Sequence, residues 1–330
     1  MHRSYLYQFK EQLKVLNRTE ATVSAYSNHV RLFLDTLEKE KKDVKAVTRA
    51  DMEEYIQSLF DYRDKRNHNK KYATGTIIVK VRALKRFFEF MEKANHIFIN
   101  PMEQIKEPGK EKRLPGAVLT TTEVRKILDG PNLGTLTGIR DRTILELFYS
   151  TGIRLGELTG LTVYDVDLQG GMVRINQGKG QKDRVVPMGR IAVRFLREYI
   201  THVRPKSTKK NRQIRTLFVN RYGQPISKQV IAILVRTYTR KAKLNKSKKV
   251  TAHTFRHTFA TELVKNGADI IAVQKMLGHV CLRTTQGYIR SLGLDLKKAH
   301  TKSHPREKDK IKRGSVKPKI KGIREQYASR

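Results

Sequence analysis

The sequence is poor in cysteine, and this deficit narrows the range of functions. Cys281 is the single cysteine among 330 residues. An intramolecular disulfide therefore cannot form, and a cysteine-based metal cage is not expected. We interpret Cys281 as a small buried apolar side chain rather than a reactive thiol. This usage of cysteine fits a reducing, cytoplasmic compartment.

Long apolar runs are also missing from the sequence. No stretch approaches the length needed to cross a bilayer, and the first residues, "MHRSYLYQFKEQL", lack the charged-then-apolar layout of a signal peptide. The composition, with 38% hydrophobic and 30% charged residues, is that of a soluble globular protein. We therefore expect no membrane partner. The length of 330 residues is sufficient for two ordinary domains.

Acidic residues are few, which leaves a large excess of positive charge. Lys and Arg number 69 against 31 Asp and Glu, and the formal net charge is +38. Such a chain repels itself unless it meets a polyanion, and nucleic acid is the commonest polyanion for a cytosolic protein. We expect a cytoplasmic, nucleoid-associated chain. Ribosomal and histone-like proteins are basic too, so charge predicts nucleic-acid binding without predicting catalysis.

The first part of the chain, residues 1–105, is predicted to be a helical domain. Helices are expected after Thr19, from Thr48 and over 74–95, because apolar residues recur there at three- and four-residue steps. Thr48 and Asp51 have the spacing of a capping box. The intervening "RDKRNHNKKY" is predicted to be a basic loop. The face away from the apolar stripes is rich in Lys and Arg, as in a helical domain that clamps DNA.

Residues 106–118 are predicted to be an extended interdomain linker, and residues 119–290 a mixed domain. Prolines at 101, 108 and 115 with nearby glycines mark the linker, and Thr120 and Glu123 then have capping-box spacing. The remaining expectations are a hairpin of 172–176 and 184–187 around Gly-Lys-Gly, a third strand at "TLFVN" (216–220), and helices over 227–244, 252–267, 269–278 and 283–290. Residues 291–330 are predicted to be a solvated basic tail able to order on a partner.

Six polar residues in the second part are candidates for chemistry: Arg154, Lys179, His253, Arg256, His279 and Tyr288. Singly, several have ordinary explanations, since an arginine at 154 can pair with Glu157 and a lysine between glycines can be an exposed turn residue. Together they include no carboxylate pair for metal-bound phosphoryl transfer and no Walker-type loop. Two guanidiniums can clamp a phosphodiester, a tyrosine can attack phosphorus, and a lysine or histidine can protonate the leaving oxygen. The set predicts metal-free transesterification of a DNA strand.

Four segments in this part resemble a known family. "TGIRLGELTGL", "GKGQKDRVVPMG", "HTFRHTFATELVKNGADIIAVQKMLGH" and "TTQGYI" are similar, in order and spacing, to the four signature boxes of the tyrosine recombinases, the phage-integrase and Xer-like family. The match spans about residues 119–290. The helical region at 1–105 resembles the family's SAM-like core-binding domain, with weaker motifs.

The resemblance implies a fold and a set of phosphate-binding residues. The fold would be mainly α with a small antiparallel β-sheet (α+β), arranged as a two-domain C-shaped clamp with a helical core-binding domain and a catalytic domain. Arg154 and Arg256 would bind the scissile phosphate. His253 and His279 would assist phosphate binding and proton movement.

The resemblance also implies a covalent mechanism and an assembly. Tyr288 would be the nucleophile that forms a 3′-phosphotyrosyl link, and Lys179 would be the general acid on the 5′ oxygen. The partner would be double-stranded DNA with inverted-repeat recombination sites. A homo-tetramer, or a hetero-tetramer with a paralogue, would exchange strands through a Holliday junction without metal or cofactor. The role would be integration or excision of a mobile element, or Xer-like dimer resolution.

Three alternatives compete with this interpretation. His253 and His257 lie one helical turn apart and could hold zinc with His279, but a zinc hydrolase of the His-Glu-x-x-His type needs glutamate where position 254 is threonine. We therefore expect His257 to support Arg256 without touching substrate.

A type IB topoisomerase uses the same phosphotyrosine step, yet the order of the boxes and the N-terminal domain favour the recombinase. A non-catalytic DNA-binding regulator has no need of a tyrosine at 288.

Overall fold

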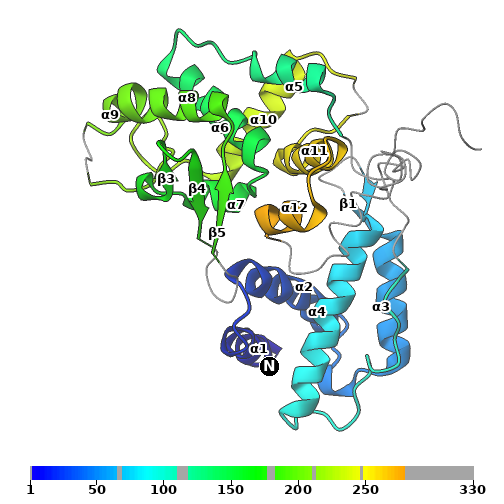
Figure 1. Ribbon diagram of the computed structural model, residues 1–330. Coiled ribbons are helices and arrows are strands. Elements are labelled where there is room, and N and C mark those ends of the chain that lie inside the picture. The colour runs from blue at the N-terminus through cyan, green and yellow to red at the C-terminus, as the bar shows by residue number, and fades with distance from the viewer. Residues whose placement is uncertain are drawn as a thin grey trace, which may run out of the picture. The chain divides into compact units, whose positions relative to one another are not determined.

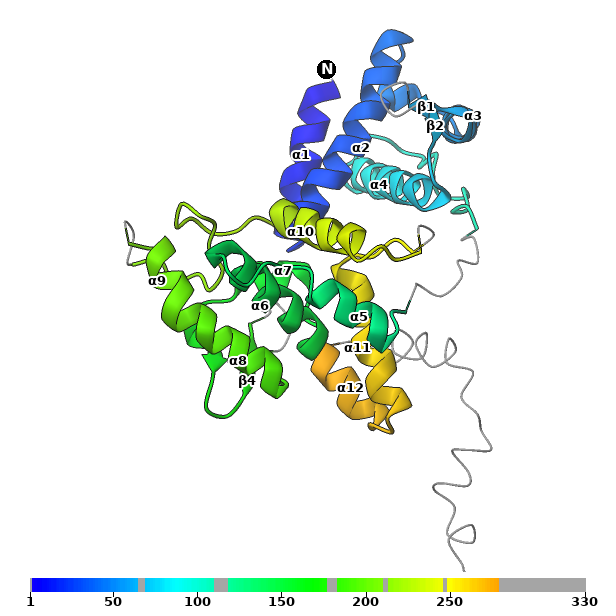
Figure 2. The same ribbon diagram turned by 90° about the horizontal axis from the view of Figure 1, so that it is seen from above.

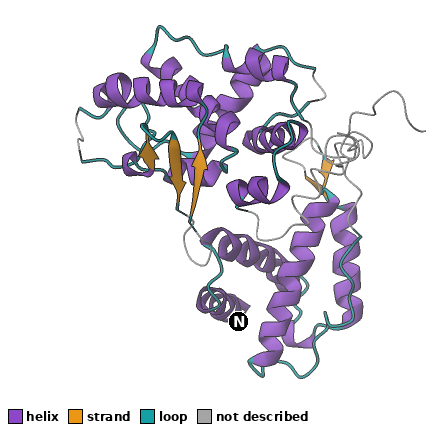
Figure 3. Cartoon of the chain, in the orientation of Figure 1, coloured by secondary structure: helices purple, strands orange, loops and turns teal. Residues whose placement is uncertain are grey.

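The computed structural model describes residues 2–64, 69–109, 118–176, 183–209, 213–245 and 248–278. The chain divides into two compact units, 1–113 and 114–330 (Figure 1). Helices dominate the described residues, and the strands are short (Figure 3). The predicted fold class, mainly α with a small antiparallel sheet, is confirmed. In the described part of the chain, none of the helices is both long and apolar enough to cross a membrane.

Two of the helices described in the first unit begin at capping side chains. The described helices are α1 (His2–Val15), α2 (Glu20–Lys39), α3 (Arg49–Asp61) and α4 (Thr74–Lys93), with a 3₁₀ turn at Val44–Ala46. The hydroxyl of Thr19 accepts from the Thr22 amide at 3.3 Å, and Thr48 with Asp51 completes the expected capping box. The loop expected between α3 and α4 carries a two-residue antiparallel pair, β1 (Arg63–Asp64) with β2 (Lys70–Lys71).

The core of this unit is built around α4, which packs against the other three helices. Phe87 and Phe88 are fully buried. Phe9 meets Phe87 edge-on with ring centroids 5.5 Å apart, and Phe33 meets Phe88 at 5.9 Å. These rings form a core, because edge-to-face packing of buried aromatics stabilises the helix contacts.

The chain after α4 continues on the first unit. Met102 and Ile105, just after Pro101, are buried in the core. The guanidinium of Arg82 donates to both oxygens of Glu107 at 2.8 and 2.7 Å. The segment directly before the predicted linker of 106–118 thus packs on the helices of this unit.

The second unit contains a three-stranded antiparallel sheet in the order β3-β4-β5. The predicted hairpin is confirmed in its strands, β4 (Met172–Ile175) and β5 (Arg184–Pro187), which pair with Ile175 opposite Arg184. The expected hairpin tip with Lys179 lies outside the described residues. The third strand is β3 (Val166–Asp167), which the sequence analysis missed.

The strand expected at 216–220 is wrong. Thr216 and Val219 form single isolated bridges, to Thr162 and Pro225. Several separate partners pair with the backbone there: the Leu217 amide donates to the Leu161 carbonyl at 2.8 Å and the Phe218 carbonyl accepts from the Ile226 amide at 3.2 Å. Arg204 also donates to the Thr216 carbonyl at 2.9 Å, and the Tyr199 hydroxyl accepts from the Val219 amide at 3.1 Å. The hydrogen-bonding groups of this β-rich run are therefore satisfied without a continuous ladder to one neighbouring strand.

Helices surround the sheet of the second unit. They are α5 (Thr121–Leu128), α6 (Leu136–Thr151), α7 (Leu155–Gly160), α8 (Arg190–Glu198), α9 (Arg204–Ser207), α10 (Lys228–Lys241), α11 (Ala252–Lys265) and α12 (Ile270–Leu277), with a 3₁₀ turn at Val163–Asp165 and a π turn at Tyr199–Val203. The expected capping box of Thr120 and Glu123 opens α5. Helix α6 is central and packs against α5, α8 and α11, while α10 packs against α5 and α7 (Figure 2). The helix expected over 283–290 lies outside the described residues.

Gly152 ends α6 in a left-handed conformation that favours glycine. Its φ of 60° is left-handed, and its amide donates to the Phe148 carbonyl at 3.1 Å. A Cβ at this position would lie 2.5 Å from Cδ1 of Phe259 and 3.1 Å from Cδ2 of Leu277. The chain turns here, and α7 begins three residues later.

We predict that Gly152→Ala lowers the free energy of unfolding by about 2–4 kcal/mol, because it adds left-handed strain to overpacking against α11 and α12. Urea unfolding at neutral pH measures the loss. Gly160→Ala is the matched control, since a Cβ there meets nothing within 4 Å and alanine favours a helical position. Equal midpoints for the two variants would contradict the prediction.

Candidate active site

Three of the six candidate residues belong to the described structure. Arg154 lies directly before α7, and His253 and Arg256 lie in the first two turns of α11. Lys179, His279 and Tyr288 fall outside the described residues, so their predicted roles stay predictions.

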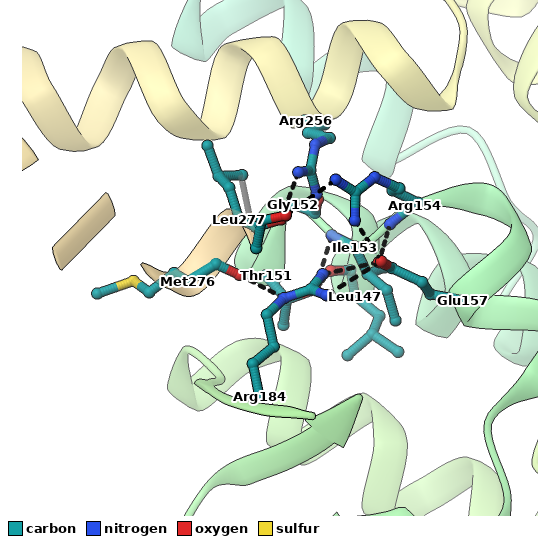
Figure 4. A network of polar contacts seen from close by, with 11 residues as sticks. Leu147, Thr151, Gly152, Ile153, Arg154, Glu157, Arg184, Arg256, Met276 and Leu277 are labelled. Atoms are coloured by element: carbon teal, nitrogen blue, oxygen red, sulfur yellow. Dashed lines mark hydrogen bonds and ion pairs between the residues drawn. The ribbon is translucent and has the colours of Figure 1, made fainter. Parts of the chain in front are cut away.

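Arg256 is buried at the junction of three helices. Its residue exposure is 1%. Its guanidinium donates to the carbonyl of Gly152 at 2.7 Å and to that of Leu277 at 2.5 Å (Figure 4). Thr251 caps α11 by accepting from the Thr254 amide, which sets the start of the helix and points Arg256 toward the ends of α6 and α12.

Arg154 reaches the same place from the turn between α6 and α7. Its Nη1 donates to Oε1 of Glu157 at 2.6 Å, and its Nη2 donates to the carbonyl of Gly278 at 3.2 Å. The local pairing with Glu157 that the sequence suggested is therefore present. The Arg154 side chain is also 38% exposed, so it is accessible to a ligand while it is paired.

A third arginine, Arg184 at the start of β5, joins the site and was missed by the sequence analysis. Its Nη1 and Nη2 donate to the two oxygens of Glu157 at 3.0 and 2.7 Å, and its Nε donates to the carbonyl of Met276 at 2.7 Å. A signal was available, because Arg184 shares a strand face with the buried Val186. A charged residue at an inward position of a strand indicates a buried partner.

The C-terminus of α12 is where the three arginines meet. Its last carbonyls, those of Met276, Leu277 and Gly278, each accept from a different guanidinium (Figure 4). A helix end leaves such carbonyls without intrahelical partners, and they carry partial negative charge. The arrangement holds three cations close together, directly before position 279.

The ionisable groups of the site respond to this charge. Burial alone would raise the pKa of Glu157, but hydrogen bonds from the Arg154 amide and from both guanidiniums lower it below its ordinary value. Desolvation, together with the charges of Arg256 and Arg154, lowers the pKa of His253 from its ordinary 6.5. His253 is therefore neutral at neutral pH and can accept a proton.

A basic cavity of about 1030 Å³ opens beside the network, between the start of α7, helix α10 and the start of α11. Arg154, Arg236, Arg240, Lys249 and His253 are among its lining residues. Its apolar lining comes from residues such as Leu155 and Val235. The cavity suits a ligand that carries negative charge.

The zinc hypothesis involved two histidines of α11 that differ in environment. His257 is buried, with 6% exposure, whereas His253 is exposed at the start of the helix. Within the described ranges, no group of three or more His, Cys, Asp and Glu side chains is placed to hold a metal. The third histidine of that hypothesis, His279, lies outside those ranges.

Comparison with known sequences shows the family of this chain. A model described as "Phage integrase family" matches residues 117–293, and one described as "Phage integrase, N-terminal SAM-like domain" matches residues 6–95. The chain is 35% identical to Tyrosine recombinase XerD of Staphylococcus saprophyticus over 286 residues, which cover 86% of this chain and 92% of the relative. It is 36% identical to Tyrosine recombinase XerC 2 of Ralstonia nicotianae over 302 residues, 91% of this chain and 85% of the relative. The chain therefore belongs to the phage integrase family and is a tyrosine-type site-specific recombinase.

Solved structures share the fold. The XerH site-specific recombinase bound to palindromic difH substrate matches with a TM-score of 0.69 and 22% identity, over 88% of this chain and 84% of that one. A lambda integrase (75–356) dimer bound to a COC′ core site matches with a TM-score of 0.67 and 16% identity, over 89% and 96%. At these identities the likeness concerns the fold.

We predict that Glu157→Gln lowers the free energy of unfolding at pH 7 by about 1–3 kcal/mol, because it removes the counter-charge of two guanidiniums while solvent screens the Arg154 side. A carboxylate with a depressed pKa stabilises fully above its ordinary value of 4.5 and loses this effect as pH falls through the lower, folded-state pKa. The difference in free energy of unfolding between the parent and Glu157→Gln, measured by urea unfolding, should therefore narrow below pH 4.5.

Glu146 supplies a control of opposite sign. Burial raises the pKa of Glu146, and this effect outweighs the opposite effect of Arg142. Lowering the pH should therefore increase the free energy of unfolding of the parent relative to that of Glu146→Gln. A gap for Glu157→Gln that stays constant from pH 7 to pH 3 would show that Glu157 does not pair as described.

Proposed function

We propose that this chain cleaves and rejoins DNA at specific sites through a 3′-phosphotyrosyl intermediate, with Tyr288 as nucleophile. The observation that carries the proposal is the meeting of Arg154 and Arg256, from separate helices, at the end of α12. The segment that follows α12 in the sequence contains His279 and Tyr288. A phosphodiester seated at the two arginines would therefore lie near the start of the segment that carries the nucleophile.

The proposed task of Arg154 and Arg256 is to bind the scissile phosphate. Arg154 and Arg184 share the carboxylate of Glu157, and Arg256 donates to carbonyls, which leaves the network positively charged. A guanidinium has five N–H donors, so Arg154 can keep its contacts with Glu157 and Gly278 while donating to a phosphate oxygen. Charge-assisted donors fixed before the reaction stabilise the charge that develops at phosphorus.

The remaining proposed roles concern proton movement and the covalent bond. The lowered pKa of His253 supports a neutral imidazole that can assist Tyr288 or the phosphate, and His279 is proposed to share this task. Attack by the Tyr288 hydroxyl forms the P–O bond to tyrosine and releases the 5′ oxygen, which takes its proton from Lys179. The 5′ hydroxyl later attacks the phosphotyrosine and reverses the step, without metal or cofactor.

Double-stranded DNA with inverted-repeat sites is the proposed partner. The formal charge of +38 and the basic cavity beside Arg154 favour a polyanion, and the XerH and lambda integrase structures are complexes with DNA. We propose a tetramer, of this chain alone or with a paralogue, that joins two sites through a Holliday junction in the cytoplasm. The same strand exchange serves integration or excision of a mobile element and Xer-like dimer resolution.

We predict that the protein forms a covalent adduct with nicked DNA that contains its site, and that Tyr288→Phe forms none, because the phenol oxygen is the attacking atom. The adduct is measured by its retarded migration on a denaturing gel, in buffer that contains EDTA. Tyr222→Phe is the control, since Tyr222 is exposed in a loop of the second unit. An adduct with Tyr288→Phe would refute the assignment of the nucleophile.

We predict that Lys179→Ala slows cleavage by about 10²–10⁴-fold, the range of a general acid, with a much smaller effect on binding. A substrate whose 5′ leaving group needs no proton should remove most of that deficit. Single-turnover cleavage of the two substrates measures it. A penalty that is equal on both would take the acid role away from Lys179.

A further inference from the structure

We propose that Arg184 is a positioning residue: it occupies the carboxylate of Glu157 so that Arg154 stays available to the scissile phosphate, and it anchors the end of α12. The inference deepens the proposed function and rests on it. Arg184 is not among the six residues that the sequence pattern predicts for the site. The network of Figure 4 connects it to both arginines of the proposed phosphate site.

The two oxygens of Glu157 are divided unequally between the arginines. Arg184 forms a fork, with Nη1 at 3.0 Å from Oε1 and Nη2 at 2.7 Å from Oε2. Arg154 contributes one side-chain nitrogen, Nη1, at 2.6 Å from Oε1, and its backbone amide at 2.7 Å from Oε2. Each carboxylate oxygen thus accepts two hydrogen bonds, and Arg184 holds the two-pronged position.

This division matters because fork geometry is the strongest arrangement that an arginine and a carboxylate can form. If Arg184 were absent, the vacated acceptor sites of Glu157 would favour a two-pronged pair with Arg154. Such a pair would draw the guanidinium of Arg154 toward Glu157 and away from a ligand. The buried Arg184 prevents this, whereas Arg154 is 38% exposed.

Arg184 also connects elements that are distant in sequence. Its Nε donates to the Met276 carbonyl at 2.7 Å, one residue before the carbonyl that Arg256 contacts and two before the carbonyl that Arg154 contacts. The side chain therefore joins β5 to α7 and to the end of α12. Loss of this anchor would loosen the acceptors that orient both phosphate-binding arginines.

The same unit offers a matched control, Arg142 of α6. Its Nε and Nη2 lie 2.8 Å from Oε1 of Glu146, and its Nη1 donates to the Leu128 carbonyl at 2.6 Å. Like Arg184, Arg142 is a largely buried arginine that holds a buried glutamate and a carbonyl. It joins α6 to the end of α5, so its loss tests stability without touching the network at α12.

The experiment measures single-turnover adduct formation by the full chain, at saturating protein, on nicked DNA that contains the site. We expect Arg184→Met to slow this step by about 10²-fold, the cost of a misplaced binding group, while DNA affinity and the melting temperature resemble those of Arg142→Met. Arg184→Lys keeps the charge but cannot form the fork, so we expect a loss of about tenfold. Arg142→Met should cleave at the parent's rate.

A double variant separates positioning from a purely structural role. In the double variant Arg184→Met with Glu157→Gln, the neutral amide no longer forms an ion pair with Arg154. Adduct formation should therefore be about tenfold faster than in Arg184→Met alone, a coupling typical of residues in contact. The double variant also replaces both buried charges, which preserves folding if Arg184→Met alone fails to fold. In that case the tenfold loss expected for Arg184→Lys, set against parent-like cleavage by Arg142→Met, carries the test.

Each outcome decides the inference. Parent-like cleavage by Arg184→Met or Arg184→Lys, or a double variant no faster than Arg184→Met, would overturn it while the adduct of the parent leaves the proposed function intact. Equal slowing by Arg142→Met would assign the effect to stability and overturn it as well. A parent that forms no adduct with its site would overturn the proposed function itself, and the inference with it.

Discussion

The carboxylate of Glu157 is the group on which the site depends. It is largely buried, and a buried charge is tolerated only when it is paired and hydrogen-bonded. Two guanidiniums and a backbone amide satisfy it, from positions 154 and 184. Glu157 in turn holds the beginning of α7 against the first residue of β5. The arginine exposed to ligand thus depends on a partner that is itself held by a buried arginine.

The guanidiniums of Arg154, Arg184 and Arg256 repel one another, and the carbonyls at the end of α12 offset part of this electrostatic repulsion. These last carbonyls are acceptors that the helix itself leaves unpaired, and each receives one guanidinium. The three guanidiniums are therefore held and oriented by the protein itself, as the proposed binding of a phosphate requires. Preorganised charge is more effective in catalysis than charge that must be gathered during the reaction. The same contacts hold the end of α12.

The turn at Gly152 makes the meeting of these elements possible. Its left-handed φ and its lack of a Cβ let Phe259 and Leu277 approach closely, and its carbonyl accepts from Arg256. The pattern Gly-x-Arg in "STGIRLGEL" thus has a physical explanation. Glycine lets α6 end against α11 and α12, and the arginine two positions later emerges beside them. The position that requires a left-handed glycine, 152, thus lies two residues before the arginine proposed to bind phosphate, 154.

Local patterns in the sequence determined much of this protein: the caps at Thr19, Thr48 and Thr120, the strands of the hairpin, and the family resemblance of the four boxes. These features depend on residues that are close in sequence, so the periodicity of apolar residues and the spacing of capping residues predict them. Tertiary structure decided the rest. The run at 216–220 is irregular because its backbone pairs with several separate partners, among them Leu161, Arg204 and Tyr199, and Arg184 belongs to the site through a carbonyl 92 positions away. A charged side chain in a strand shows that a partner is needed, but only the packed fold determines which carboxylate and which carbonyl lie within reach.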